Sequence, residues 1–192
     1  MNLPNKLTIL RIILIPVFVA VYFINAIPYN YLIAAVVFVV AAFTDFLDGY
    51  IARKYNLVTN LGKFLDPIAD KVLVAAALIV MLVVPDGGAA ILPAYSSIFV
   101  AVILARELII SGFRMVAAAK GTVLAADKAG KIKTFTQDIA ITVLLVGAEF
   151  QAGVYTAMNI VGLIILGLAT LLTIISGTEA IVKNRSVLKD EK

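Results

Sequence analysis

The chain has 192 residues, 62% of them hydrophobic, and its mean hydropathy of +1.06 lies far above that of soluble globular domains. Lys and Arg number 16 against 12 Asp and Glu, a formal net charge of +4, while Cys, His and Trp are absent. These absences exclude disulfides, thiolate and imidazole catalysis, and zinc sites built from Cys or His. Acid–base or metal chemistry would have to come from carboxylates, Lys, Tyr, hydroxyl groups or a bound phosphate.

Six apolar segments follow one another along the chain, and a helix needs about 20 apolar residues to cross a bilayer. We predict transmembrane helices over residues 4–24, 29–46, 68–84, 91–119, 134–150 and 154–182. Turn-forming residues separate them at 25–28, 85–88 and 147–153, and residues 49–63 form a long polar connection. The first segment lacks a cleavage site of small residues after it, so we expect a retained helix. The sequence thus predicts an all-α integral membrane protein, a single domain over 1–192 built as a bundle of six transmembrane helices.

The basic residues indicate how this bundle is oriented. With the amino terminus in the cytoplasm, all 16 Lys and Arg fall at the cytoplasmic side or in the cytoplasmic half of a helix. The three outer connections contain neither residue. The amino and carboxyl termini are then both cytoplasmic. The positive charge favours contact with anionic membrane lipids, and the chain has no basic soluble domain that would bind nucleic acid.

Four aspartates are expected at one depth, the cytoplasmic leaflet. Asp45 and Asp48 end the second predicted helix, and Asp66 and Asp70 begin the third. The i, i+3 and i, i+4 spacings place each pair on one face of its helix. Carboxylate oxygens prefer hard divalent cations, so two such faces turned toward each other would form a cage for Mg²⁺ or Mn²⁺. Because ionisable groups at the edge of hydrocarbon are costly, we interpret them as an active site open to the cytosol.

The aspartates belong to a longer pattern with eight specified residues, Asp45-x-x-Asp48-Gly49-x-x-Ala52-Arg53, eight residues, then Gly62-x-x-x-Asp66-x-x-x-Asp70. At every fixed position this pattern resembles the signature of the CDP-alcohol phosphotransferase family. The resemblance covers the whole chain, and residues 2–11, 105–108 and 128–134 are similar to bacterial members that use glycerol 3-phosphate. It implies transfer of a phosphatidyl group from CDP-diacylglycerol to glycerol 3-phosphate, with release of CMP. It further implies a homodimer in the plasma (inner) membrane of a bacterium, with its active site facing the cytoplasm.

The resemblance also implies roles for single residues. Asp45, Asp48 and Asp66 are expected to bind two metal ions, and Asp70 to be both a ligand and the general base. The expected contacts to CDP-diacylglycerol are Asn5, Thr8, Gly49, Ala52, Arg53, Thr59 and Gly62. Guanidinium and ammonium groups bind phosphate, which makes the basic residues candidates for the acceptor phosphate. These are Arg11, Lys63, Arg106, Arg114, Lys131 and Lys133.

Structural roles compete with several of these assignments. Asp66 precedes Pro67 and would also suit a helix N-cap. Arg106 beside Glu107 would also suit an ion pair that holds the fourth helix, with Glu107 orienting Arg106. The lysines Lys128, Lys131 and Lys133 equally fit topology and contact with lipid head groups. Glycines inside apolar helices are typical of close helix packing, as at Gly147, Gly162 and Gly167.

Two other functions fit parts of the pattern. A cation transporter could use the same aspartates, but it should place polar groups at several depths and on both sides of the membrane. The outer halves of the predicted helices are almost purely aliphatic. A family member could instead use serine, inositol phosphate or phosphatidylglycerol as acceptor. The basic cluster favours a phosphate-bearing acceptor over serine, and only the resemblance separates glycerol phosphate from inositol phosphate.

Overall fold

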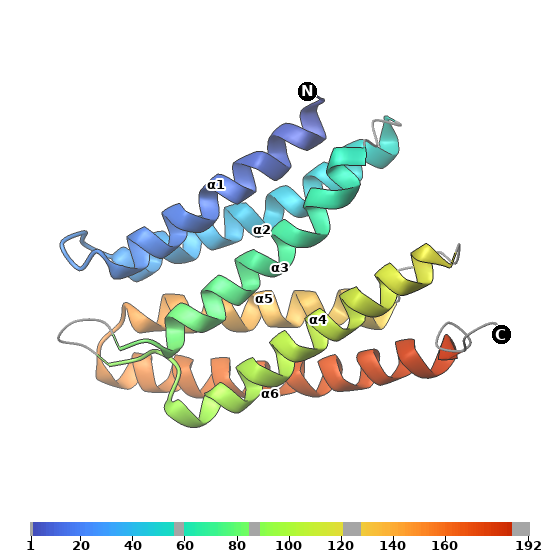
Figure 1. Ribbon diagram of the computed structural model, residues 1–192. Coiled ribbons are helices and arrows are strands. Elements are labelled where there is room, and N and C mark those ends of the chain that lie inside the picture. The colour runs from blue at the N-terminus through green and yellow to red at the C-terminus, as the bar shows by residue number, and fades with distance from the viewer. Residues whose placement is uncertain (1, 56–59, 85–88, 121–127, 186–192) are drawn as a thin grey trace.

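The computed structural model describes residues 2–55, 60–84, 89–120 and 128–185. These residues form six long helices, a short 3₁₀ helix and no strand, which confirms the predicted all-helical fold (Figure 1). The helices are α1 (Leu3–Phe23), α2 (Asn30–Lys54), α3 (Asn60–Leu82), α4 (Ser97–Ala119), α5 (Lys128–Ala148) and α6 (Ala152–Lys183), with η1 (Ala94–Ser96) preceding α4.

Two antiparallel helix pairs organise the bundle. Helix α1 lies along α2, and α5 lies along α6 (Figure 1). Helix α3 packs on α1, α4 packs on α6, and a contact between α2 and α5 joins the two halves. Helix α1 begins and α6 ends at the same end of the bundle, where α2 also ends and α5 begins (Figure 1). That end of the bundle therefore collects the charged helix ends.

Apolar side chains fill the interior and also cover much of the outside. Phe18, Tyr22 and Phe38 are fully buried between α1 and α2, whereas Phe43, at 60%, and Ile98, at 66%, are exposed. Exposed apolar side chains on helices of this length are typical of surfaces that face lipid. Lipid tails are as apolar as the side chains, so close packing has to hold such helices together.

Close packing is most evident between α5 and α6. A Cβ atom added at Gly162 would lie 2.6 Å from Cγ of Leu144, and one added at Gly147 would lie 2.7 Å from Cβ of Met158. Both distances are too short for real carbon atoms, so the predicted packing role is confirmed for these two glycines. It is wrong for Gly167, where an added Cβ meets no described atom within 4 Å.

Within the described residues, four helical segments are both long and apolar enough to cross a membrane. They are Leu3–Phe23, Asn30–Ala52, Ala94–Ala119 and Ala152–Lys183. These segments support a multi-pass membrane protein. Helices α3 and α5, with 23 and 21 residues, have sufficient length as well. Their first turns carry the charged residues, which lowers their mean hydropathy.

Three helix boundaries differ from the prediction in the same way: the end of α2, the start of α3, and the start of α5, which lies at Lys128 and not at residue 134. Helix α2 continues to Lys54 and α3 begins at Asn60, so most of the expected polar connection at 49–63 is helical. The prediction ended each helix where hydrophobicity ends, but backbone hydrogen bonds continue through polar turns that reach beyond the hydrocarbon. Asp66 consequently lies in the second turn of α3, and the N-cap alternative for Asp66 is wrong. The helix expected from residue 91 begins only after Pro93, which cannot donate a backbone hydrogen bond.

Candidate active site

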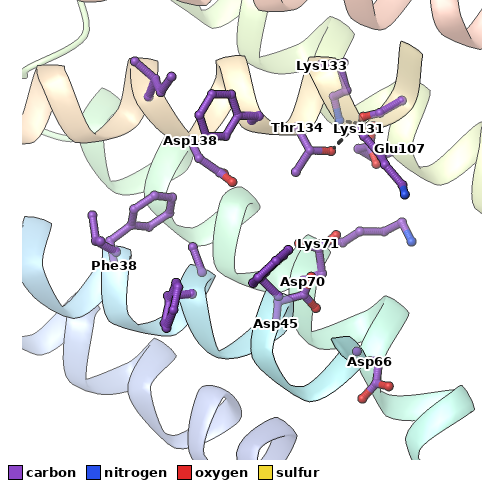
Figure 2. Close-up of a pocket in the computed structure, with 18 of the residues that line it drawn as sticks. Phe38, Asp45, Asp66, Asp70, Lys71, Glu107, Lys131, Lys133, Thr134 and Asp138 are labelled. Carbon is purple, nitrogen blue, oxygen red and sulfur yellow. Dashed lines mark hydrogen bonds and ion pairs between the residues drawn. The ribbon is translucent and has the colours of Figure 1, made fainter. Parts of the chain in front are cut away.

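A cavity of about 980 Å³ lies among α2, α3, α4 and α5 at the charged end of the bundle (Figure 2). One wall carries the four signature aspartates, Asp45 and Asp48 from α2 and Asp66 and Asp70 from α3. The opposite wall carries ionisable residues of α4 and α5. These are Arg106, Glu107, Arg114, Lys131, Lys133 and Asp138. The structure therefore gathers residues that are up to 93 positions apart in the sequence around one space.

The cavity continues between apolar surfaces beyond this charged part. Phe38, Val39 and Phe43 of α2 lie on one side, and Ile139 and Val143 of α5 lie on the other. Phe43 follows Phe38 and Val39 by five and four residues, and Val143 follows Ile139 by four, so each set lies along one side of its helix. A molecule with a charged head and an apolar tail would match both parts of this cavity.

Arg11 of α1 supports the acidic wall from behind. Its side chain is fully buried, and its Nη2 donates a hydrogen bond to Oδ2 of Asp48 at 2.5 Å. Its Nη1 lies 2.8 Å from Oδ1 of Asp45, and its Nε donates to the carbonyl oxygen of Ala41 at 3.3 Å. A buried guanidinium is tolerated because the two carboxylates offset its charge and because Nη2 and Nε both donate hydrogen bonds. Arg11 is not among the described residues that line the cavity, although it was expected at the acceptor phosphate.

Thr8, one turn before Arg11 on the same face of α1, reaches the third aspartate. Its Oγ1 lies 2.6 Å from Oδ1 of Asp66 and 3.5 Å from Oδ2 of Asp48, so the shorter contact is the stronger hydrogen bond. This hydroxyl connects α1 to α3 across the end of α2. Thr8 and Arg11 together fix the positions of three of the four aspartates.

The donor set of the acidic wall fits a hard divalent cation. Four carboxylates from two helices offer only oxygen ligands, which Mg²⁺ and Mn²⁺ prefer. In the part of the chain that the structure describes, however, no three acidic side chains are close enough together to hold a metal ion as they stand. In this arrangement, Arg11 places a positive charge against Asp45 and Asp48, and Thr8 donates a hydrogen bond to Asp66.

Lys133 and Arg106 share one carboxylate on the basic wall. Nζ of Lys133 donates to Oε1 of Glu107 at 2.6 Å, and Nη1 of Arg106 donates to the same oxygen at 2.9 Å. The ion pair considered for Arg106 and Glu107 is therefore present. Arg114 and Lys131 are more exposed and line the cavity near its opening. Two cations on one carboxylate leave this wall positively charged.

The remaining predicted residues divide into three groups. Gly49 lines the cavity, whereas Asn5, Gly62 and the half-buried Ala52 are not among the described residues that line it. Thr59 lies outside the described residues, as do the side chains of Arg53 and Lys63.

Asp138 was missed by the sequence interpretation. It lies on α5 one turn after Thr134, and Figure 2 shows its carboxylate directed into the cavity. An acidic residue inside an otherwise apolar segment is a functional candidate in its own right. The sequence carries that signal, because residue 138 is an acidic residue within the apolar segment predicted at 134–150.

Comparison with known proteins shows the family of this chain. Residues 1–175 match the sequence model of the family described as CDP-alcohol phosphatidyltransferase. The chain belongs to this family. The match confirms the resemblance that rested on the eight signature residues.

Three curated members of the family show the extent of the similarity. The chain is 41% identical over 200 residues to CDP-diacylglycerol–glycerol-3-phosphate 3-phosphatidyltransferase of Bacillus subtilis, covering 98% of this chain and 97% of that protein. It is 44% identical over 176 residues to the protein of the same name from Rickettsia bellii, covering 92% and 91%. The corresponding protein of Escherichia coli K12 is 42% identical over 146 residues, covering 75% and 76%.

Proposed function

We propose that this protein transfers the phosphatidyl group of CDP-diacylglycerol to glycerol 3-phosphate, giving phosphatidylglycerophosphate and CMP. The product leads to the anionic phospholipids phosphatidylglycerol and cardiolipin. The observation that carries the proposal is the single cavity with an acidic wall, a basic wall and an apolar extension. A liponucleotide needs the apolar surface, its diphosphate needs positive charge, and a phosphate-bearing acceptor needs a second basic group. The relatives that are 41% and 44% identical to this chain carry the name of this reaction.

We place the protein in a bacterial inner membrane as one domain over residues 1–192. All six helices cross the bilayer, both termini are cytoplasmic, and the cavity opens to the cytoplasm. In Figure 1, α1 begins and α6 ends at the same end of the bundle. This arrangement and the basic residues at that end support the topology. Helix α6 offers exposed aliphatic residues, including Ile164 and Leu171, for a homodimer.

Asp45, Asp48, Asp66 and Asp70 would hold two Mg²⁺ or Mn²⁺ ions in the active enzyme. Such ions supply positive charge to the diphosphate and to the phosphate of the departing CMP. Gly49 lacks a side chain, so a nucleotide can approach the backbone of α2. The other nucleotide contacts proposed are Asn5, Thr8, Ala52, Arg53, Thr59 and Gly62.

Asp70 is the proposed general base. As the acceptor hydroxyl attacks the phosphorus that bears diacylglycerol, its proton passes to the carboxylate of Asp70. A new phosphorus–oxygen bond forms, the bond between this phosphorus and the CMP oxygen breaks, and CMP leaves with that electron pair. Arg106, Arg114, Lys131 and Lys133 would bind the acceptor phosphate on the opposite wall, and Lys63 is a further candidate for this role.

Replacing Asp70 with Asn tests its role as base. We expect turnover to fall by about 10²–10⁴-fold, because general-base assistance is worth that factor, with little change in either KM. CMP release should be followed while Mn²⁺ is raised stepwise. Full recovery at high Mn²⁺ would show that Asp70 is a metal ligand only, and the proton would then pass to water or to a lipid phosphate.

The choice of acceptor is tested by direct competition among candidates. Purified protein in detergent with CDP-diacylglycerol and Mn²⁺ should release CMP with glycerol 3-phosphate, and much less with serine, inositol phosphate or phosphatidylglycerol. EDTA should stop the reaction reversibly, and Asp48→Asn should abolish it without unfolding the protein. A faster reaction with another acceptor would reassign the substrate. Full activity in EDTA would contradict the role of the metal ions.

A further inference from the structure

We propose that Ser176 and Gly177 of α6 are positioning residues for the acceptor phosphate and act through Arg106. The inference rests on the proposed function, because it takes Arg106 as one of the groups that bind this phosphate. Arg106 lines the cavity, whereas Ser176 and Gly177 lie behind it and do not line it. Neither residue belongs to the family signature of residues 45–70.

Ser176 holds one end of the guanidinium. Nη2 of Arg106 donates a hydrogen bond to Oγ of Ser176 at 2.8 Å, and Ser176 is 4% exposed. The hydroxyl proton of Ser176 points away, toward the carbonyl oxygen of Thr173 at 3.3 Å, so a lone pair of Oγ faces Arg106. Nη1 is held by Glu107 at 2.9 Å on the other side. The guanidinium is therefore fixed at two of its nitrogen atoms before any ligand binds.

Gly177 provides the space that this position of Arg106 requires. A Cβ atom at residue 177 would lie 3.0 Å from Cγ and 3.1 Å from Nε of Arg106. The stem of Arg106 thus passes directly over the backbone of α6. At Gly167 on the same helix, an added Cβ meets no described atom within 4 Å. At Gly177, by contrast, the three atoms nearest to the added Cβ all belong to Arg106.

This arrangement extends to the second cation of the wall. Glu107 accepts from Arg106 and from Lys133 through the same Oε1, and Lys133 is 3% exposed. A chain of contacts therefore runs from Ser176 on α6, through Arg106 and Glu107 on α4, to Lys133 on α5. The side chain of arginine is long and flexible, so ordering it costs conformational entropy. Fixing it before the ligand binds lowers the free-energy cost of binding an anion. Helix α6 thus contributes to acceptor binding without touching the acceptor.

The test compares matched substitutions on α6. Ser176→Ala and Gly177→Ala should raise the KM for glycerol 3-phosphate, Ser176→Ala by about 10-fold, as expected when a hydrogen bond to a charged group is lost. The KM for CDP-diacylglycerol and kcat should stay within about twofold of the parent protein, because neither residue reaches the acidic wall. The controls are Thr178→Ala, which removes an exposed hydroxyl of α6, and Gly167→Ala, which adds a methyl group in open space. Both controls should leave the two KM values unchanged.

A double-substitution cycle shows whether Ser176 acts through Arg106. In an Arg106→Met background, Ser176→Ala should cause no further rise in the KM for glycerol 3-phosphate. The rise in melting temperature that glycerol 3-phosphate produces gives the same comparison without turnover. An equal increase of both KM values, or an unchanged effect of Ser176→Ala in Arg106→Met, would overturn the inference. Failure of the parent protein to use glycerol 3-phosphate would instead refute the proposed function.

Discussion

Arg11 is the single residue on which the acidic wall depends most. It is fully buried and contacts both aspartates of α2, and it donates to the backbone of the same helix. Two charges taken out of water are stabilised only by each other, so removing one of them leaves the other without compensation. Asp48 is itself 2% exposed, which gives it little access to water if Arg11 is lost.

Arg11→Met should therefore destabilise the folded protein by about 3–5 kcal/mol, the cost of breaking a buried ion pair from one side. Arg11→Lys should fall between Arg11→Met and the parent protein, since one ammonium cannot bridge both carboxylates as a guanidinium does. Thermal unfolding in detergent measures both effects, and Arg185→Met, at an exposed position, is the control. An unchanged melting temperature for Arg11→Met would mean that the two aspartates are stabilised without Arg11.

Helices α5 and α6 depend on glycine at their contact. Gly162 is buried, and an added Cβ would meet Cγ and Cδ2 of Leu144 at 2.6 and 2.7 Å. Leu144 is itself 1% exposed, so it has no free space into which it can turn. The same helix pair carries Lys133 on α5 and Ser176 on α6, so its packing also sets the geometry of the basic wall.

We expect Gly162→Ala to destabilise the protein by about 1–3 kcal/mol through overpacking. Gly167→Ala should be neutral or stabilise by up to about 1 kcal/mol, because alanine favours a helix over glycine. Thermal unfolding compares the two variants directly. In a Leu144→Ala background, Gly162→Ala should cost less stability than it does in the parent protein, because the atoms that clash are gone. If the two glycine variants unfold at the same temperature, the close contact does not hold α5 to α6.

Sequence patterns predicted the helices better than their ends. Hydrophobicity located all six, but it stopped α2 at residue 46, whereas the helix continues to Lys54. Hydropathy indicates where the side chains stop being apolar. The backbone hydrogen bonds of a helix can continue beyond that point, because they do not depend on side-chain polarity. The extra turns matter because they keep Asp48 and Gly49 on a rigid helix instead of a loop.

The positions of site residues could be predicted from the sequence where they depend only on the spacing of residues within one helix. The two aspartate pairs and Lys131 and Lys133 lie on the cavity as their positions suggested. Contacts between distant helices were not predictable, because they depend on how the helices pack. The partners of Arg11 and the bond from Arg106 to Ser176 are of this kind.

Orientation in the membrane is a property of the whole molecule, and the absence of Cys makes it easy to test. Tyr95 in η1 is 62% exposed at the end opposite the aspartates, and Arg185 is exposed after α6. In intact spheroplasts, a membrane-impermeant maleimide should label Tyr95→Cys but label Arg185→Cys only after permeabilisation. CMP release by each variant provides the control for folding. Labelling of Arg185→Cys in intact spheroplasts would place the carboxyl terminus outside and reverse the proposed topology.

The distribution of charge between the two ends of the bundle also bears on how the protein enters its membrane. The segments that join α1 to α2, α3 to α4 and α5 to α6 contain no Lys or Arg. If consecutive helices insert as hairpins, none of these three tips carries a basic side chain through the bilayer, where each would cost about 2.5–3.5 kcal/mol on insertion scales. The residues that form the active site would remain throughout insertion on the side of the membrane where the chain is synthesised. Biogenesis of this protein would then need no dedicated machinery to translocate a charged domain.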